Sequence, residues 1–399
     1  MNTVKNFFQK INPYQDDSVW LVRILYVDIY LSKFMKICRM AVIAYTLVMT
    51  TLQTFLFLQK FDGIYFIKYL ALYAGSVVIL VATFAVPYVY RSVAVVINCL
   101  DSWPVVYITN KMKKTIKVES FFVNGFVFLN TLLALFSASL YFVPVDGDDD
   151  IFFVFRLCEE LFPRWKNLLS WFYRILFLPV AVLMPSVLYL TLYCMTRLRF
   201  QFYLLIHLLK VVNESDKEKV DKSVLLYGQQ HQEEITRKLK FCIKRHNEIY
   251  EITYTASKKI DTFIFIFSIA SAIFGTSIVV FYFSFQGSVE GIRYLGVAAL
   301  VIVAVAMVVS IFLCGQSIEN VSNELVEVLQ QMDWNYWNRE NKFLYLMFLS
   351  HAQQTLQIKF SNSVALNYEL GVSIGKFIYS MLSVMSQIKD IDYGSYYKM

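Results

Sequence analysis

The stretch YLGVAALVIVAVAMVVSIFLC, residues 294–314, contains no charged side chain and no proline. Crossing about 30 Å of hydrocarbon takes roughly 20 helical residues at about 1.5 Å each, which is the length of this stretch. A helix that is apolar on every face has no side suited to water. The stretch therefore predicts a membrane-spanning helix, and it decides the fold class.

Further apolar stretches of similar length occur on both sides of it. They are residues 40–58, 65–87, 120–143, 168–196, 261–285 and 364–385, of which the last is the most polar. Hydrophobic residues make up 57% of the chain and charged residues only 17%, which excludes a soluble globular protein. The sequence predicts an all-α membrane protein with seven transmembrane helices.

The distribution of Lys and Arg predicts the orientation of the chain. Of 37 basic residues, 27 fall in the N-terminal segment and the second, fourth and sixth connections, seven fall on the other side, and three lie within spans. Because basic connections remain in the cytoplasm, we expect a cytoplasmic N-terminus and an extracellular C-terminus. The first 36 residues lack the single apolar run of a signal peptide.

Several functional classes are excluded by motif and charge pattern. The sequence has no nucleophile elbow, phosphate loop or His-Glu-x-x-His pattern, so we expect neither catalysis nor a cofactor. Cys242 and His246 share a helix face, but no further ligand stands near them, so we expect no metal site. Basic residues flank apolar runs instead of forming one stripe, which argues against nucleic-acid binding. A G-protein-coupled receptor would place the 27 basic residues on the wrong side.

Polar residues concentrate in the predicted cytoplasmic segments. Residues 197–259 indicate helical extensions of the fourth and fifth spans, and residues 319–334 continue the sixth. Apolar residues recur at helical spacing in the second and third of these extensions. They are Ile235, Leu239, Cys242, Ile243, Ile249 and Ile252, followed by Leu325, Val328, Leu329 and Met332. We expect a cytoplasmic anchor bundle that packs within the chain, against other subunits, or both.

A series of residues at fixed spacing follows the sixth span. It comprises Cys314-Gly315-Gln316-Ser317, Ser322, Glu327, Asp333-Trp334 and His351-Ala352-Gln353. This series resembles the C-terminal signature of the insect odorant receptor family, with Gln316 where that family has Asn and His351 where it has Arg. Residues 364–369 and 379–382 extend the resemblance into the last span.

The resemblance implies a subunit of a heteromeric, odorant-gated, non-selective cation channel. The family assembles as tetramers in which a tuning subunit joins a shared co-receptor, and it resides in the plasma membrane of sensory neurons. This chain is similar to the tuning subunit, because its second cytoplasmic segment is shorter than that of the co-receptor. The expected partners are that co-receptor, a small volatile odorant and the lipid bilayer.

Two faces of the last span are candidates for the pore. Glu369, Ser373, Lys376, Ser380, Ser383 and Gln387 form one polar face at helical spacing. Polar groups that face lipid are costly, so this face is expected to meet water or protein. The resemblance instead implies a gate at Leu382 with Met385 nearby, and our candidate pore and gate residues are Leu382, Ser383, Met385 and Ser386.

Aromatic residues crowd the predicted outer halves of the helices and indicate a site for a small apolar ligand. The candidate ligand-binding residues are Tyr69, Tyr73, Phe136, Ser139, Tyr173, Phe177 and Tyr294. An interfacial aromatic belt is the alternative for those nearest the rim. Asp146, Asp148, Asp149 and Asp150 are expected to form a solvated acidic loop.

These expectations divide the chain into consecutive segments. They are a cytoplasmic N-terminus (1–39), transmembrane helices 1–4 with pocket elements (40–196), a cytoplasmic helical loop (197–260), transmembrane helices 5–6 (261–314), a cytoplasmic anchor helix (315–363), the pore helix (364–386) and an extracellular tail (387–399). The alternative to the channel subunit is a gustatory-type or metabotropic seven-span chemoreceptor.

Overall fold

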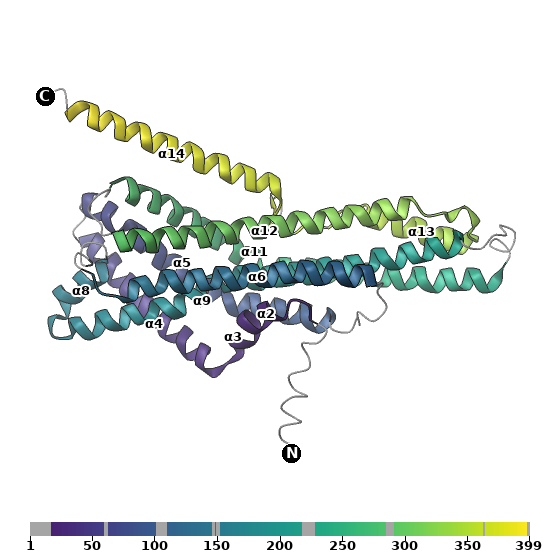
Figure 1. Cartoon of the computed structure of the whole chain (residues 1–399), viewed down its shortest axis with the longest axis horizontal. Helices are drawn as coiled ribbons and strands as arrows, with labels where there is room; N and C mark the ends of the chain where they lie inside the picture. The colour runs from purple at the N-terminus through teal and green to yellow at the C-terminus, as the bar shows by residue number, and fades with distance from the viewer. Residues whose placement is uncertain are drawn as a thin grey trace, which may run out of the picture.

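The computed structural model describes residues 17–59, 63–100, 110–145, 148, 152–217, 228–284, 291–361 and 364–396. The helices are α2 (Trp20–Val22), η2 (Arg23–Asp28), α3 (Ile29–Leu31), α4 (Lys33–Gln59), α5 (Gly63–Leu100), α6 (Asn110–Phe142), α8 (Phe153–Leu161), η4 (Pro163–Trp165), α9 (Lys166–Lys217), α11 (Gln229–Ser284), α12 (Gly291–Gln330), η5 (Trp334–Tyr336), α13 (Arg339–Ala352) and α14 (Tyr368–Tyr396). They form an elongated bundle, as Figure 1 shows. The predicted all-α fold is confirmed.

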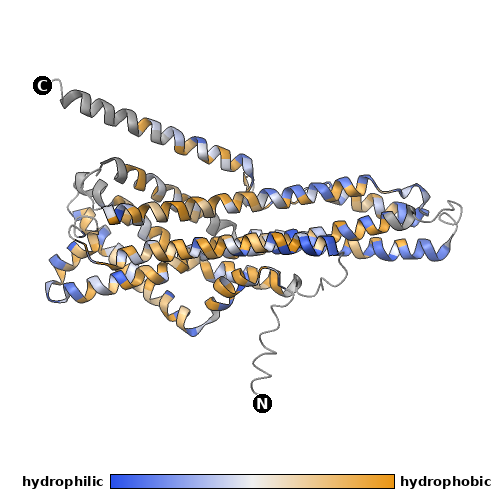
Figure 2. Cartoon of the chain, viewed as in Figure 1, coloured by the Kyte–Doolittle hydropathy of each residue, from blue (hydrophilic) through white to orange (hydrophobic). Residues whose placement is uncertain are grey.

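Several helices are longer than a membrane requires. The helices α9, α11 and α12 contain 52, 56 and 40 residues. At about 1.5 Å per residue, α9 is about 78 Å long, whereas the hydrocarbon layer is about 30 Å thick. Figure 2 shows that the bundle is apolar over much of its length and hydrophilic toward α13. We call this hydrophilic end, built from α13 and the adjoining ends of α9, α11 and α12, the polar extension.

Among the described residues, five helices have the length and composition to cross a membrane. They are Lys33–Gln59, Tyr69–Ile97, Asn110–Phe142, Pro163–Asn213 and Gly291–Gln330. The fifth predicted span corresponds to a shorter apolar stretch of α11, Phe265–Val280. Pro179 and Pro185 lie inside α9, which is tolerated in membrane helices whose neighbours satisfy the freed backbone groups.

The start of the last helix differs from the prediction. We expected the seventh span to begin at residue 364, but helix α14 begins at Tyr368. Two short antiparallel strands, β1 (Lys359–Ser361) and β2 (Val364–Ala365), precede it, with Lys359 opposite Ala365 and Ser361 opposite Val364. The hairpin turns the chain between α13 and α14, and α14 then diverges from the bundle (Figure 1).

The interior of the bundle contains satisfied polar groups. The Asn130 side-chain amide of α6 donates to the Tyr189 hydroxyl of α9 over 2.7 Å and to the Val303 carbonyl oxygen of α12 over 3.3 Å. The hydroxyls of Tyr26 and Thr131 lie 2.7 Å apart. Because a buried polar group without a partner is costly, these bonds fix how the helices fit together.

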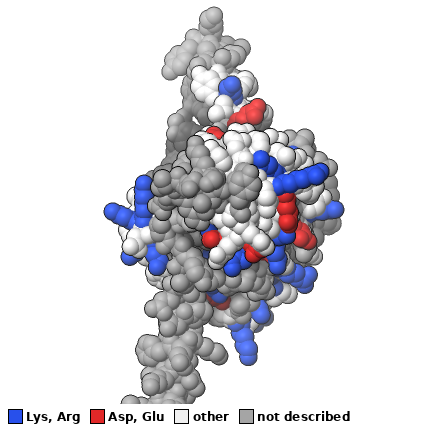
Figure 3. All heavy atoms as spheres, turned by 90° about the vertical axis from the view of Figure 1, so that its right-hand side faces the viewer, with Lys and Arg blue, Asp and Glu red and all other residues white. Residues whose placement is uncertain are grey.

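The predicted apolar stripes are buried in the polar extension. Ile235 and Leu239 of α11 and Leu325 and Leu329 of α12 are at most 2% exposed. Tyr345 of α13 donates its hydroxyl to the Leu329 carbonyl oxygen over 2.9 Å. The expectation that these stripes pack within the chain is confirmed. Figure 3, an end-on view of the polar extension, shows Lys and Arg side chains around its edge.

Candidate ligand-binding site

Aromatic side chains gather at the end of the bundle opposite the polar extension, where α4, α5, α8 and α9 meet. We call Tyr45 and Phe57 of α4, Tyr69 and Tyr73 of α5, Phe153 of α8 and Tyr173 of α9 the aromatic cluster. The ring centroid of Phe153 lies 5.8 Å from that of Phe57 and 5.3 Å from that of Tyr69. These separations suit tilted and edge-on aromatic pairs. The helices α4 and α5 thus share one apolar contact region with α8 and α9, which lie much later in the chain.

Two of the tyrosine hydroxyls at the cluster have protein partners. The Tyr73 hydroxyl lies 2.9 Å from Oγ1 of Thr54, and the Tyr45 hydroxyl donates to the Leu169 carbonyl oxygen over 3.3 Å. An aromatic wall with few polar groups is the usual composition of a site for a small apolar molecule, which such rings hold by dispersion and area burial.

A second group of rings continues from Tyr173 toward the ends of α6 and α12. The Phe177 ring centroid lies 5.0 Å from that of Tyr173 and 5.3 Å from that of Tyr141, with which it is stacked. The Phe152 ring contacts Phe177 at 5.9 Å and Tyr173 at 6.1 Å. Together with the aromatic cluster, these rings form a continuous series of contacts from α4 across α9 to α6 and the segment before α8.

A buried ion cluster, formed by Asp148, Arg174 and Arg293, lies beside these rings. The Asp148 carboxylate accepts hydrogen bonds from Nη2 of Arg174 over 2.5 Å and from Nε and Nη2 of Arg293 over 2.8 and 2.7 Å. The guanidinium groups also donate to the carbonyl oxygens of Leu140, Tyr141 and Val143. The ion cluster therefore ties the segment after α6 to α9 and α12.

The burial of Asp148 corrects the expectation of a wholly solvated acidic loop. Asp148 is 4% exposed, and Arg293 is 1% exposed. Two guanidinium groups offset the desolvation of one carboxylate, and the donors left over are taken by carbonyl oxygens. Asp146, Asp149 and Asp150 lie outside the described residues.

Four of the predicted ligand-binding residues are brought together by the fold. Tyr69, Tyr73 and Tyr173 belong to the aromatic cluster, and Phe177 contacts Tyr173. Tyr69 is fully buried, whereas the other three are half-buried. Tyr69 and Tyr73 are four residues apart on α5, and Tyr173 and Phe177 are four residues apart on α9. Helical spacing is therefore enough to place each pair on one face of its helix.

The other three predicted ligand-binding residues are not members of the aromatic cluster. The Phe136 side chain is 47% exposed. Ser139 is also exposed, and its hydroxyl donates within α6 to the Phe136 carbonyl oxygen over 2.7 Å. Tyr294 is half-buried near the start of α12.

The candidate gate residues lie on α14. The backbone of Leu382, Met385 and Ser386 is helical, but their side chains lie outside the described residues. Ser383 is half-buried. The backbone places Leu382 and Met385 three residues apart, close to one face of the helix.

Sequence reasoning missed Phe152, Phe153 and Phe155 of the connection between α6 and α9. The sequence contains an indication of their burial, because they belong to an apolar run, IFFVF at residues 151–155, directly after the acidic residues. Arg174 offered a second signal, because a cation within a predicted span needs a partner. Only the fold shows that the partner is Asp148.

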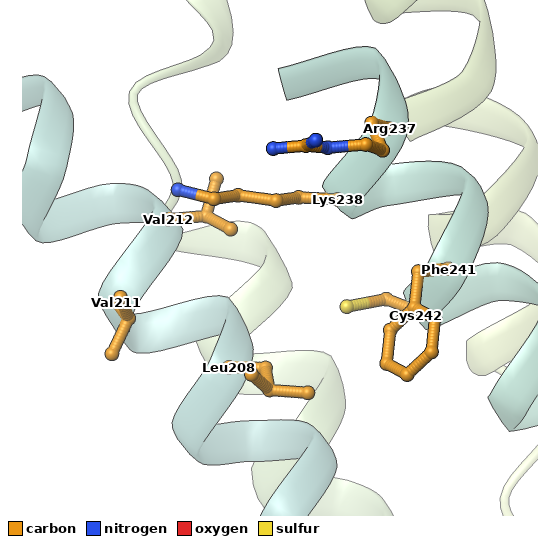
Figure 4. A pocket seen from close by; sticks show the side chains of 7 residues that line it. All are labelled: Leu208, Val211, Val212, Arg237, Lys238, Phe241 and Cys242. Atoms are coloured by element: carbon orange, nitrogen blue, oxygen red, sulfur yellow. The ribbon is translucent and has the colours of Figure 1, made fainter. Parts of the chain in front are cut away.

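A separate groove lies in the polar extension, between α9 and α11. It has a volume of about 270 Å³ and is lined by Leu208, Val211, Val212, Arg237, Lys238, Phe241 and Cys242. Figure 4 shows Lys238 extending toward Val212 from the opposite helix. Burial raises the pKa of the Cys242 thiol to about 12, although Lys238 opposes this, so the thiol is neutral. Among the described residues, no group of three or more metal-binding side chains could hold an ion.

Apolar helices of this length, with an aromatic cluster at one end and a polar extension at the other, define a multi-pass all-α membrane protein with a candidate ligand site. Residues 112–379 match the family model described as 7tm Odorant receptor. The match spans more than half of the chain, and the chain belongs to the odorant receptor family. This is a family of receptors and not of enzymes.

Solved structures share this fold. The insect olfactory receptor OR5 from Machilis hrabei, in complex with eugenol, matches with a TM-score of 0.67 and 11% identity over 93% of this chain and 97% of that one. A second structure of OR5 from Machilis hrabei matches with a TM-score of 0.66 and 11% identity, covering 96% and 98%. No curated protein matches the sequence.

Proposed function

We propose that this odorant receptor is the tuning subunit of a heteromeric, odorant-gated, non-selective cation channel. It binds a small volatile apolar ligand at the outer end of the bundle and gates a pore lined by α14. A shared co-receptor completes the assembly, a tetramer in the plasma membrane of sensory neurons, with the N-terminus in the cytoplasm. The observation that carries the ligand part of this proposal is the aromatic cluster.

The position of the aromatic cluster supports ligand binding there. Met49 and Phe57 of α4 contribute to the same buried group as Tyr69, Leu157 and Tyr173, so one small molecule could contact four helices. Such a ligand can favour an open state only if it contacts that state more favourably than the closed one. A site shared by several helices provides this difference because each contact changes when a helix shifts.

The exposure of α14 supports the pore assignment. Val372, Phe377, Ile378 and Tyr379 are between 49% and 75% exposed although they are apolar or aromatic. A membrane helix with apolar residues on its outer face requires lipid or another chain as its neighbour. Four copies of α14 around one axis would place part of this surface between subunits.

The segment before α14 connects the bundle to the proposed pore. The Leu366 amide donates to the Ile358 carbonyl oxygen over 2.8 Å, and the Tyr368 amide donates to the side-chain oxygen of Gln316 on α12 over 3.2 Å. A displacement of α12 would therefore be passed to the start of α14. We propose this contact as the route from ligand site to gate.

Whole-cell currents test the proposed function. Cells expressing this chain with and without an insect co-receptor would be exposed to volatile esters, alcohols and aromatic compounds. We expect a cation current only in the pair, and we expect Leu382→Ala to shift the concentration that gives half the maximal current. Val384→Ala is the matched control, because at 100° per residue it lies on a different face of α14.

Two results would contradict parts of the proposed function. Surface expression of both chains without any current would contradict the channel proposal and favour a gustatory-type or metabotropic chemoreceptor. A current from this chain alone would contradict the tuning-subunit assignment.

A further inference from the structure

Gln53 of α4 is a polar residue on an otherwise apolar buried face. The buried residues of this helix are Val42, Met49, Gln53 and Phe57, the last three at a spacing of four. Residues four apart lie on one face of a helix. Met49 and Phe57 both belong to the buried group that contains Tyr69 and Phe153. Gln53, which lies between them, is therefore directed toward the aromatic cluster.

The side-chain amide nitrogen of Gln53 has no hydrogen-bond partner among the described residues. The residue is 3% exposed, and its Nε2 is buried without a hydrogen bond. A buried donor without an acceptor is unfavourable, because it has lost its bonds to water. Asn130, another amide within a predicted span, has two acceptors for its Nδ2 group. An amide donor left open beside an aromatic cluster indicates a position for an acceptor that the described residues do not supply.

We infer that Gln53 is a specificity-determining residue that donates a hydrogen bond to a carbonyl or ether oxygen of the ligand. The inference rests on the proposed function and adds the chemical class of the ligand: a small neutral molecule with an apolar body and one acceptor oxygen. The Tyr73 hydroxyl and the Tyr45 hydroxyl already have protein partners, whereas the Gln53 amide nitrogen is open to bind such an oxygen. A site with an open donor discriminates against a ligand that leaves the donor unpaired.

Pairs of compounds with nearly the same size and the same carbon chain test the inference. Acetophenone and isopropylbenzene differ by a carbonyl oxygen in place of a methyl group, and methyl hexyl ketone and methyloctane differ in the same way. In cells that express the chain with a co-receptor, we expect the ketones to activate at lower concentrations than the hydrocarbons. Gln53→Met has nearly the same length and no donor, and it should raise the half-maximal concentration of the ketones about tenfold while leaving the hydrocarbons unchanged.

Matched variants separate recognition from structural support. Gln59→Met changes an exposed glutamine of the same helix and should leave all responses unchanged. Because Gln53→Met and Gln53→Leu remove an unpaired donor, both should reach the cell surface at least as well as the unmodified chain. Reduced surface levels of both variants, with Gln59→Met at the normal level, would assign Gln53 a structural role and overturn the inference.

The remaining outcomes distinguish the inference from the proposed function. An unmodified receptor that responds to ketones, with a ketone-to-hydrocarbon ratio that Gln53→Met leaves intact, would overturn the role of Gln53 alone. Equal responses of the unmodified receptor to ketones and hydrocarbons would also overturn the role of Gln53. If the unmodified chain and the co-receptor reach the surface but respond to no compound, the result would contradict the proposed function itself.

Discussion

Single residues carry the strongest local constraints in this protein, and Asp148 is the clearest case. Its carboxylate neutralises one of the two guanidinium groups that the fold buries beside Phe152 and Phe155. The guanidinium carbon of Arg174 lies 4.5 Å from the ring centroid of Phe155, which adds a cation–π contact. Removing the carboxylate would leave both buried cations without an acidic partner among the described residues.

We therefore predict that Asp148→Asn destabilises the receptor strongly. Breaking a buried ion pair by removing one partner typically costs roughly 3–5 kcal/mol. The melting temperature of the detergent-purified protein, together with its surface level in cells, measures the effect. Glu159→Gln is the matched control, since Glu159 pairs with Lys166 but its side chain is 57% exposed, and losing such a pair should cost less than about 1 kcal/mol. Equal effects of the two substitutions would contradict the structural role of the ion cluster.

At the scale of elements, the contact between α12 and the segment before α14 depends on Gly315. A Cβ atom added at Gly315 would overlap the carbonyl oxygen of Leu366, and this oxygen belongs to the backbone. A backbone atom cannot swing aside as a flexible side chain can. The absence of a side chain at Gly315 thus permits the close approach that holds the start of α14 to the bundle.

We expect Gly315→Ala to separate these two elements. Overpacking a tight contact typically costs about 1–3 kcal/mol, so the variant should show a lower surface level and a smaller odorant-evoked current per surface receptor. Gly125→Ala on α6 is the control, because nothing lies within 4 Å of the added atom and alanine is the better helix former. A normal current from Gly315→Ala would show that this contact does not connect the bundle to the proposed pore.

At the scale of the whole molecule, charge and hydropathy are separated along the long axis. Apolar surface covers much of the bundle, and the polar extension carries basic side chains around its edge (Figures 2 and 3). Pairs such as Lys240 with Glu340, 3.0 Å apart, join α11 to α13 there. Because exposed ion pairs contribute little, the buried leucines and Tyr345 hold this end together.

The separation of charge predicts how the molecule sits in the membrane. With 27 of 37 basic residues on one side, a tag at the N-terminus should be inaccessible to antibody in intact cells and accessible after permeabilisation. A tag at the C-terminus should stain without permeabilisation. The reverse pattern would refute the cytoplasmic N-terminus and would remove the argument against a G-protein-coupled receptor.

Much of the fold and part of the aromatic cluster could be predicted without coordinates. Apolar length and helical spacing are local properties, so the helices and their buried stripes follow from them. Tyr69, Tyr73, Tyr173 and Phe177 were predicted because aromatic residues recur near the ends of the spans. The α8 aromatics were missed because residues between spans give no sign of which helix they will contact.

The sequence by itself determined the all-α membrane class, the helix faces and, through the residues after Cys314, the family resemblance. Only the tertiary structure decided that Asp148 pairs with an arginine 145 residues away and that Gly315 touches Leu366. It also decided that the Nε2 group of Gln53 faces the aromatic cluster with no acceptor among the described residues. The physical reason is that periodicity and hydropathy are properties of neighbouring residues. The partner of a buried polar group, by contrast, is fixed by which helices pack together.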